Sequence, residues 1–503
     1  MTPAIDAKKK WFALTLLTLG AIANRGVAAD PRDRPNIILI LADDLGWGEL
    51  GCLGQTQIRT PRLDRMAAEG MLLTDFYAGS TVCAPSRAVL MLGQHTGRNP
   101  IRGNRYGDTP LRPQETTVAT LLRQAGYATG IIGKWGLGRM ETSGHPSRQG
   151  FDYYFGYENH WHAHNYYPSY LFRNHERIEL PNVVRNETDL GAGVATEKRV
   201  YGPDQMQAEA LAFIRRHRQE PFFLYYAHLI PHANNEATRE TGDGTEVPDL
   251  GIYADQPWSA QDRGHAAMIG YLDRQVGELL DVLIELEIAS RTLVIFTSDN
   301  GPHRESGHDV SRFQPAGPFR GFKRDLYEGG IRVPTVAWWP GHIPAGSASA
   351  HPADFADFLP TALELAGIDS PEAIDGVSFL PTLIRDGAGQ AERPYLYWEF
   401  YEQGSSQAVR REGWKAVRRP AFTGRIELYD LTADPGEARD VADQQPELVA
   451  AMERIMAEAH QPDANWQPRG RTPPAPPPGL GEFPEHMEKR GRGSQPSPST
   501  QPN

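Results

Sequence analysis

The sequence has few cysteines, no excess of basic residues and no long apolar segment. Cys52 and Cys83 are the only cysteines among 503 residues, which excludes a disulfide-rich scaffold. No Cys/His spacing typical of a zinc site or a redox pair is present. The formal net charge is −12, which argues against a nucleic-acid partner, because such partners require a basic face. An anionic ligand would therefore have to be bound by a local basic pocket.

The apolar run 11–23 is too short to span a bilayer. Lys8 to Lys10 precede it, and Val27-Ala28-Ala29 follow with the small residues that a signal peptidase reads. We therefore predict a cleaved signal peptide over 1–29, a mature chain that begins at Asp30, and export to the periplasm or the extracellular space. An uncleaved membrane anchor is the alternative.

Apolar runs alternate with helical patterns over some 300 residues. The runs NIILIL (36–41), PFFLYYAHLIPH from Pro221 and TLVIFTSDNG from Thr292 are typical of strands buried on both faces of a parallel sheet. Helical patterns begin at Ala119 and His265. This alternation predicts an α/β domain over 30–375, in which helices sandwich a mostly parallel central sheet.

The pattern changes towards the C-terminus. Short strand-like segments with turns, followed by a helix with Leu448, Met452 and Ile455 on one stripe, predict a smaller α+β domain over 376–465 with an antiparallel sheet. Residues 466–503 are rich in proline and predict a disordered tail. No internal repeat is evident.

Polar residues follow the apolar runs directly: Asp43, Asp44, His232, Asp299 and Asn300. Ligands of open α/β sheets bind beyond the carboxyl ends of the strands, so these distant segments are expected to converge. The alternative is that each residue only caps a strand or forms a turn. The three carboxylates and one amide among them offer oxygen ligands, which suit Ca²⁺ or Mg²⁺ and not zinc.

Isolated cations accompany these oxygen ligands. Arg87, Lys134 in GKWGLG and Lys323 in FRGFKRDLYEGG could join a metal ion in stabilising an oxyanion. Each of them taken alone is most often a solvated surface charge. The residues also leave three possibilities open for Cys83: a disulfide with Cys52, a thiol nucleophile, or covalent conversion into another group.

Six spaced motifs carry a resemblance to a known family. CAPSRAVLMLGQHTGR resembles the C-x-P-S-R element of the type I sulfatases, in the alkaline-phosphatase-like superfamily. NIILILADDLGWGELGC, IRTPRLDRMAAEG, GYATGIIGKWGLG, FTSDNG and GPFRGFKRDLYEGGIRVP fit the same family in the same order. LYDLTADPGEARDV resembles its C-terminal subdomain, so the resemblance covers roughly residues 35 to 460.

The resemblance implies a modified cysteine and a metal. A maturation enzyme would oxidise Cys83 to formylglycine, an aldehyde whose hydrate attacks the sulfur of the ester and then expels sulfate as the carbonyl re-forms. Ca²⁺, in preference to Mg²⁺, would be held by the residue at 83 together with Asp43, Asp44, Asp299 and Asn300.

The resemblance also assigns roles to basic residues. Arg87 and Lys134 would hold the hydrate, while His232 and Lys323 would contact the sulfate and the leaving oxygen, with His232 as the better proton donor. His228 is the neighbouring alternative to His232.

One position departs from the family pattern. Many members read GKWHLG, and that histidine helps to position the hydrate, whereas this chain has Gly136. Either the contact is lost or another histidine supplies it, and His162, His164 and His303 are the candidates for this and for substrate binding. The aromatic stretch 151–172 suits either the wall of a sugar pocket or packing between the domains.

The resemblance favours an exported, calcium-dependent sulfatase that acts on sulfated carbohydrate or aryl sulfates. A phosphomonoester or phosphonate-ester hydrolase with the same formylglycine, and a non-catalytic glycan-binding homologue, are the alternatives.

Overall fold

The computed structural model describes residues 34–467. The predicted signal peptide and nearly all of the predicted tail lie outside the described residues. Between residues 34 and 467, no helix has the length and apolar character needed to cross a membrane.

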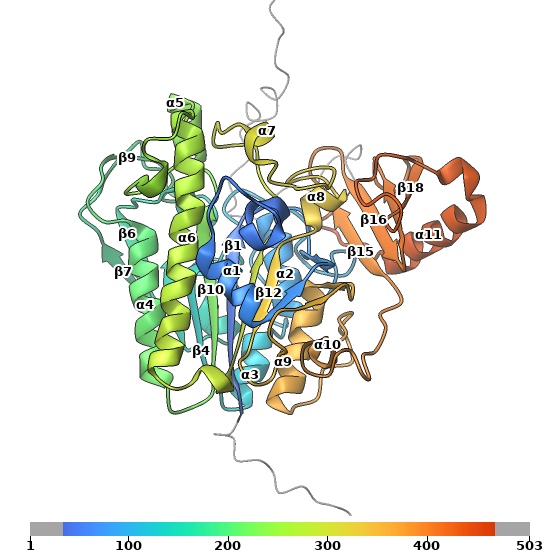
Figure 1. Cartoon of the computed structure of the whole chain (residues 1–503), viewed down its shortest axis with the longest axis horizontal. Coiled ribbons are helices and arrows are strands. Elements are labelled where there is room, and N and C mark those ends of the chain that lie inside the picture. Colours follow the sequence, from blue (N-terminus) through green and yellow to red (C-terminus); the bar gives the residue numbers. More distant parts are fainter. Residues whose placement is uncertain (1–33, 468–503) are drawn as a thin grey trace, which may run out of the picture.

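A ten-stranded sheet forms the centre of the molecule (Figure 1). From one edge to the other, its strands are β13 (Ser347–Ser349), β2 (Met71–Leu73), β12 (Thr335–Trp338), β11 (Thr292–Ser298), β1 (Asn36–Asp43), β10 (Phe222–Pro231), β4 (Ala128–Lys134), β5 (Tyr153–Tyr157), β6 (Tyr170–Arg173) and β7 (Glu176–Glu179). The five central strands from β11 to β5 are parallel. Antiparallel pairs occur only towards the two edges of this sheet.

The central strand β1 shows why the apolar runs become parallel strands. All of its eight residues are buried. Ile37, Leu39 and Leu41 contribute to the hydrophobic core on one face of the sheet, and Ile38, Ile40 and Ala42 to the core on the other. Because successive side chains point to opposite faces, a strand buries a continuous apolar run completely only if both faces of the sheet are covered.

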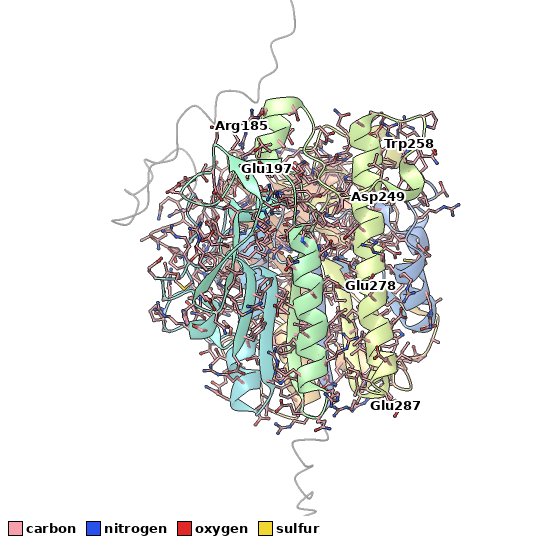
Figure 2. The ribbon with its side chains drawn as sticks, turned by 90° about the vertical axis from the view of Figure 1, so that its left-hand side faces the viewer. Arg185, Glu197, Asp249, Trp258, Glu278 and Glu287 are labelled. Carbon is pink, nitrogen blue, oxygen red and sulfur yellow. The ribbon has the colours of Figure 1, made fainter. Side chains whose placement is uncertain are left out.

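Helices cover both faces of the sheet. One face packs against α1 (Pro61–Glu69), α4 (Gly202–His217) and α6 (Ala260–Glu285). Figure 2 shows α4 and α6 side by side on this face, with Glu278 on the outer side of α6. On the other face lie α2 (Cys83–Leu92), α3 (Val118–Gln124), α9 (Phe358–Ala366) and α10 (Leu380–Ile384).

Shorter elements lie in the connections. They are the helices α5 (Asn235–Thr241), α7 (Val310–Phe313) and α8 (Glu328–Ile331), and the strand pairs β3 (Phe76–Tyr77) with β14 (Ala353–Asp354) and β8 (Val183–Arg185) with β9 (Val194–Glu197). In Figure 1, β1 runs upward, and α5, α7 and α8 lie towards the upper end of the molecule. The carboxyl ends of the parallel strands therefore open into this region of loops and short helices.

The C-terminal part forms a separate antiparallel sheet of β15 (Leu396–Phe400), β16 (Ser406–Arg411), β17 (Trp414–Arg418) and β18 (Ile426–Asp430). Helix α11 (Pro446–Ala459) packs on it through Met452, Met456 and Ala459, with Leu448 and Ile455 at the margin. The predicted fold class, a mostly parallel sheet between helices with a smaller α+β part, is confirmed. The division at residue 375 stays a prediction, and α10 just beyond it contributes Leu380 and Leu383 to the core of the larger part.

The aromatic stretch after β4 is mostly buried. Tyr154, Tyr157 and Tyr166 are at most 1% exposed, and they pack within the cores of the larger part rather than between the two sheets. Trp161 stays partly exposed, and its ring contacts that of Tyr106 edge to face, with the ring centroids 5.2 Å apart. Most of this stretch is therefore core, and Trp161 is one of its few partly exposed rings that could form part of a pocket wall.

Candidate active site

The polar residues that follow the central strands meet at one edge of the sheet. The strands β11, β1, β10 and β4 are adjacent and parallel, so their carboxyl ends lie side by side. Asp43 at the end of β1 is opposite Pro231 of β10. As expected from the sequence, this register brings together segments that are up to 256 residues apart.

The two adjacent aspartates point to different partners. Asp43 Oδ2 accepts a hydrogen bond from Lys134 Nζ at 2.7 Å. Asp44 Oδ2 accepts from Lys323 Nζ at 2.8 Å, and its backbone adopts a positive φ of 66°. Burial alone would raise the pKa of Asp44, but Lys323 and then His232 outweigh burial and lower it.

Asp299 and Asn300 tie the end of β11 to that of β1. Asp299 Oδ1 accepts from the backbone N–H of Asp44 at 3.1 Å. The side-chain amide of Asn300 donates to Asp44 Oδ1 at 2.7 Å, which leaves Asn300 Oδ1 buried without a hydrogen-bond partner. Burial and the neighbouring charge of Asp43 raise the pKa of Asp299.

Cys83 is the first residue of α2 and is 2% exposed. Its Sγ lies 3.4 Å from Lys134 Nζ and 3.8 Å from Asp43 Oδ1. Burial raises the pKa of its thiol to about 12, although Lys134 and Lys323 oppose that shift. Both cysteines are free, so the structure contains no Cys52–Cys83 disulfide.

Arg87 lies one helical turn after Cys83 and is completely buried. Its Nε and Nη2 donate to Asp299 Oδ2 at 3.1 and 2.8 Å, and its Nη1 donates to the backbone oxygen of Lys134 at 2.7 Å. Burial alone would lower the pKa of Lys134, but Asp43 and then Cys83 raise it overall. Both cations are thus fixed and fully charged beside the cysteine.

His232 faces Lys323. Its Nδ1 is 2.8 Å from the backbone oxygen of Ala233, an acceptor that assigns the proton to Nδ1 in the neutral ring. Its Nε2 lies 3.2 Å from Lys323 Nζ and 3.5 Å from Asp44 Oδ2. Burial and then Lys323 lower the pKa of His232 well below its usual value.

His228, the alternative to His232, lies within the core. Its Nε2 is 2.7 Å from Gln275 Oε1, and its Nδ1 accepts from the backbone N–H groups of Leu229 and Ile230. Because both ring nitrogens have protein partners, the geometry favours His232 as the histidine that could contact a ligand.

A divalent cation fits this arrangement. Ligand atoms of Asp43, Asp44, Cys83 and His232 all lie within 4.8 Å of one another. The unpartnered Asn300 Oδ1 adds a carbonyl oxygen of the kind that Ca²⁺ prefers. Asp299 is held by Arg87 and the Asp44 backbone and is not part of that four-residue group.

The three histidines proposed for substrate binding lie in different surroundings. The ring of His164 stacks on His232 with centroids 5.0 Å apart, and its Nδ1 is 3.0 Å from Glu236 Oε2. Both nitrogens of His303 bind the protein, through the backbone of Pro231 and of Glu305. His162 packs on Tyr170, and its Nε2 is 3.0 Å from the Tyr170 carbonyl oxygen. The structure thus places His164 and His303 beside His232, while His162 lies with the buried aromatic rings.

One further histidine, which the sequence analysis did not select, lies beside the charged cluster. His160 is 4% exposed, and its Nδ1 is 2.5 Å from Asp108 Oδ1. The sequence offered three histidines in NHWHAH without a reason to prefer His160. Its packing against Gly136 appears only in the folded chain.

A cluster that could hold a metal ion, fixed cations and a buried cysteine beyond the ends of parallel strands are typical of an enzyme that hydrolyses anionic esters. The family model described as Sulfatase matches residues 35–368, and the model described as N-sulphoglucosamine sulphohydrolase, C-terminal, matches residues 318–461. The chain therefore belongs to the sulfatase family, and it is a sulfuric ester hydrolase.

Individual relatives agree with this assignment. The chain is 37% identical to the N-acetylgalactosamine-6-sulfatase of Canis lupus familiaris over 76% of this chain and 72% of the relative. It is 32% identical to the arylsulfatase A of Homo sapiens over 86% of this chain and 88% of the relative. The solved structure described as "Crystal structure of Ps i-CgsB in complex with k-i-k-neocarrahexaose" superposes with a TM-score of 0.70 at 27% identity, over 85% of this chain and 94% of that chain.

Proposed function

We propose that this protein is an exported sulfatase that removes sulfate from a carbohydrate, by means of a formylglycine derived from Cys83 and a bound Ca²⁺. The observation that carries the proposal is the position of Cys83. The C-x-P-S-R cysteine begins a buried helix with its Sγ 3.4 Å from Lys134 Nζ and 3.8 Å from Asp43 Oδ1. A group at this point is surrounded by the fixed charges that an ester oxyanion requires.

The charge balance of the site suits a sulfate ester. The carboxylates of Asp43, Asp44 and Asp299 are matched in number by Arg87, Lys134 and Lys323. A divalent cation held by Asp43, Asp44, Asp299, Asn300 and the residue at 83 would make the pocket positive, and it would supply Lewis-acid stabilisation of the sulfate oxygens. Ca²⁺ is favoured over Mg²⁺ because Ca²⁺ takes several protein carboxylate and amide oxygens at once, whereas Mg²⁺ usually keeps several of its waters.

The modified residue would supply the nucleophile. When present, a formylglycine hydrate provides one oxygen for attack on sulfur and a second hydroxyl that allows the sulfated residue to release its product. Arg87 and Lys134 hold the position of residue 83 and stabilise negative charge on its oxygens. His232 and Lys323, 3.2 Å apart, lie together on the Asp44 side of the cluster, where they share a proton that can pass to the leaving oxygen.

Named relatives and exposed aromatic rings of this chain both support a carbohydrate substrate. The N-acetylgalactosamine-6-sulfatase is named for a sugar sulfate, and the solved Ps i-CgsB complex contains neocarrahexaose. In this chain, the partly exposed ring of Trp161 lies next to His160, and the partly exposed ring of Tyr106 contacts Trp161. The Tyr106 hydroxyl donates to Asp189 Oδ1 at 3.0 Å. Apolar ring faces with polar edges bind sugars well, and aryl sulfates would fit the same surface.

The test is a mass spectrum of the tryptic peptide 66–87 from active protein, made in a host that contains the maturation enzyme. We expect an aldehyde at residue 83 in this protein. Protein made in a host without that enzyme should keep the thiol at residue 83 and be inactive. Cys83→Ser and Cys83→Ala should each lower turnover of a sulfated sugar by roughly 10³-fold or more, and only the serine variant should accumulate a sulfated residue 83.

Cys52→Ser is the matched control, because Cys52 lies outside the cluster, and it should keep both the aldehyde and the activity. Active protein with an unmodified thiol at residue 83 would contradict the proposal. Faster hydrolysis of a phosphate monoester or phosphonate ester than of every sulfate ester would instead support the alternative hydrolase.

A further inference from the structure

Gly136 is a position where no side chain fits. It lies two residues after Lys134, at the end of β4, with a positive φ of 71°. A Cβ at this position would be 2.6 Å from His160 Nε2 and closer still to Cε1. Glycine is therefore required both by the left-handed backbone and by the imidazole that already fills the space.

The imidazole that fills this space comes from another segment. His160 follows β5 and is 4% exposed. Its Nδ1 is 2.5 Å from Asp108 Oδ1, whereas its Nε2 is buried and has no hydrogen-bond partner among residues 34–467. A buried ring nitrogen without a partner is costly unless a ligand completes it.

Asp108 is held in an unusual conformation to reach His160. It is 2% exposed and has a positive φ of 62°, which a residue with a side chain rarely adopts. Its backbone N–H donates to the carbonyl oxygen of Arg105 at 3.0 Å. Whichever of the two side chains carries the shared proton, Asp108 occupies Nδ1 and leaves Nε2 for another group.

The charges that surround Cys83 also act on His160. Burial lowers the pKa of His160 well below its usual value, Lys134 and Arg87 lower it further, and Asp43 and Asp299 oppose this shift. The pKa of His162 is lowered to about 3 by burial, with the Tyr170 carbonyl and Arg177 as its further influences. Of these two histidines, His160 is therefore the one that lies within the electrostatic environment of the active site.

We propose that His160 is a positioning residue whose Nε2 hydrogen-bonds to an oxygen of the group formed at residue 83. It thereby supplies, from the segment after β5, the imidazole that residue 136 of this chain lacks. Asp108 fixes the orientation of the ring, and Gly136 leaves the space for it. This inference rests on the proposed function, because it requires an oxygen-bearing group at residue 83.

The test compares His160→Ala with the wild type after the aldehyde content of both has been measured by mass spectrometry. An aminooxy probe reacts with the free aldehyde and not with its hydrate, so loss of a hydrogen bond to the hydrate should speed labelling of residue 83 by about fivefold. The kcat for a sulfate ester should fall by about 10- to 100-fold, with KM changed less than about threefold. Free imidazole should restore part of the kcat of His160→Gly, because it can occupy the vacated space.

His175→Ala is the control, since His175 is an exposed histidine whose ring stacks on His145, and it should leave labelling and kcat unchanged. If His160→Ala does not fold, the isosteric Asp108→Asn replaces it, with a smaller change in the same direction. A fully converted His160 variant with the wild-type labelling rate and kcat would overturn the inference. A loss of kcat that is explained by a lower thermal stability, and that imidazole does not restore, would overturn it as well. A thiol at residue 83 in active wild-type protein would instead overturn the proposed function itself.

Discussion

What each side chain in this site can do depends on which of its nitrogen or oxygen atoms has no hydrogen-bond partner within the protein. His232 donates through Nδ1 to the carbonyl of Ala233, so only Nε2 can face a ligand. His228 and His303 have both nitrogens occupied by the protein. Three histidines of similar burial thus differ in what they can do, and the difference lies in hydrogen bonds rather than in exposure.

The role of His232 can be tested with leaving groups of different quality. His232→Ala should lower kcat/KM for a sulfated sugar by roughly 10²- to 10³-fold, because a sugar alkoxide leaves only if it is protonated. For an activated nitrophenyl sulfate the loss should stay below about tenfold, since that oxygen leaves without a proton. Steady-state kinetics on both esters make the comparison.

His217→Ala provides the reference for this experiment, because His217 pairs with Glu220 at the C-terminal end of α4, before the start of β10, whereas His232 follows the end of that strand. Its kinetics on both esters should match the wild type. An equal loss on the two esters in His232→Ala would assign His232 to substrate positioning instead of proton transfer.

At the scale of elements, the site depends on two adjacent strand ends. The ends of β1 and β11 bring Asp43, Asp44 and Asp299 together in a buried space. Arg87, Lys134 and Lys323 match these carboxylates in number, and the unpartnered Asn300 oxygen offers a further ligand for a cation. A bound cation would therefore stabilise the pairing of these strand ends as well as the chemistry.

Metal removal should show this effect without any measurement of turnover. Chelation should lower Tm, and Ca²⁺ should restore it in a concentration-dependent way, reaching about 2.7 kcal/mol of stabilisation at 100 times the Kd. Mg²⁺ should restore less at the same concentration. Asn300→Ala should weaken the Ca²⁺ response, because it removes the unpartnered carbonyl oxygen.

A matched control lies at the opposite end of the same strand pair. The Asn36 side-chain amide donates to Thr292 Oγ1 at 3.0 Å. Asn36→Ala should therefore lower Tm, while the rise in Tm on addition of Ca²⁺ should be as large as in the wild type. A Tm that does not respond to Ca²⁺ in the unmutated protein would refute the metal assignment.

At the scale of the whole molecule, the C-terminal sheet is joined to the active-site segment by a buried ion cluster. Lys415 on β17 lies 2.8 Å from Glu328 Oε1 and 3.0 Å from Glu437 Oε1, and all three side chains are fully buried. Burial alone would raise the pKa of Glu328, but Lys415 and then Arg332 lower it to about 2. Burial raises the pKa of Glu437 to about 7.

We expect the stability of the fold to depend strongly on this ion cluster. Glu328 begins α8, five residues after Lys323, so the C-terminal sheet helps to hold the segment that carries an active-site cation. Lys415→Met should lower the free energy of unfolding by about 3–5 kcal/mol, because it removes the cation that the two buried carboxylates of Glu328 and Glu437 share. Denaturant titration of the purified protein measures this loss.

The control is Arg411→Met on the neighbouring strand β16, which removes an exposed pair with Glu412. It should change stability little, since surface ion pairs contribute little. A Lys415→Met variant as stable as Arg411→Met would show that the cluster does not hold the two sheets together.

The sequence alone determined the fold class and most of the cluster. The run 36–41 and those from Pro221 and Thr292 are largely apolar, which is typical of parallel strands covered on both faces. Because the carboxyl ends of such strands meet, Asp43, Asp44, Asp299 and Asn300 could be placed together from their positions after the runs. The C-x-P-S-R motif added Cys83 and Arg87.

Tertiary structure alone decided where each histidine of the segment 160–164 lies. His160, His162 and His164 stand two residues apart in the chain, and no local pattern separates them. In the fold, His160 packs against Gly136 and Asp108, while His162 packs against Tyr170. Contacts between segments 24 and 52 residues apart in the sequence arise from the pairing of β4 with β5 and from the loops around them, so the physical reason for this choice is present only once the chain has folded.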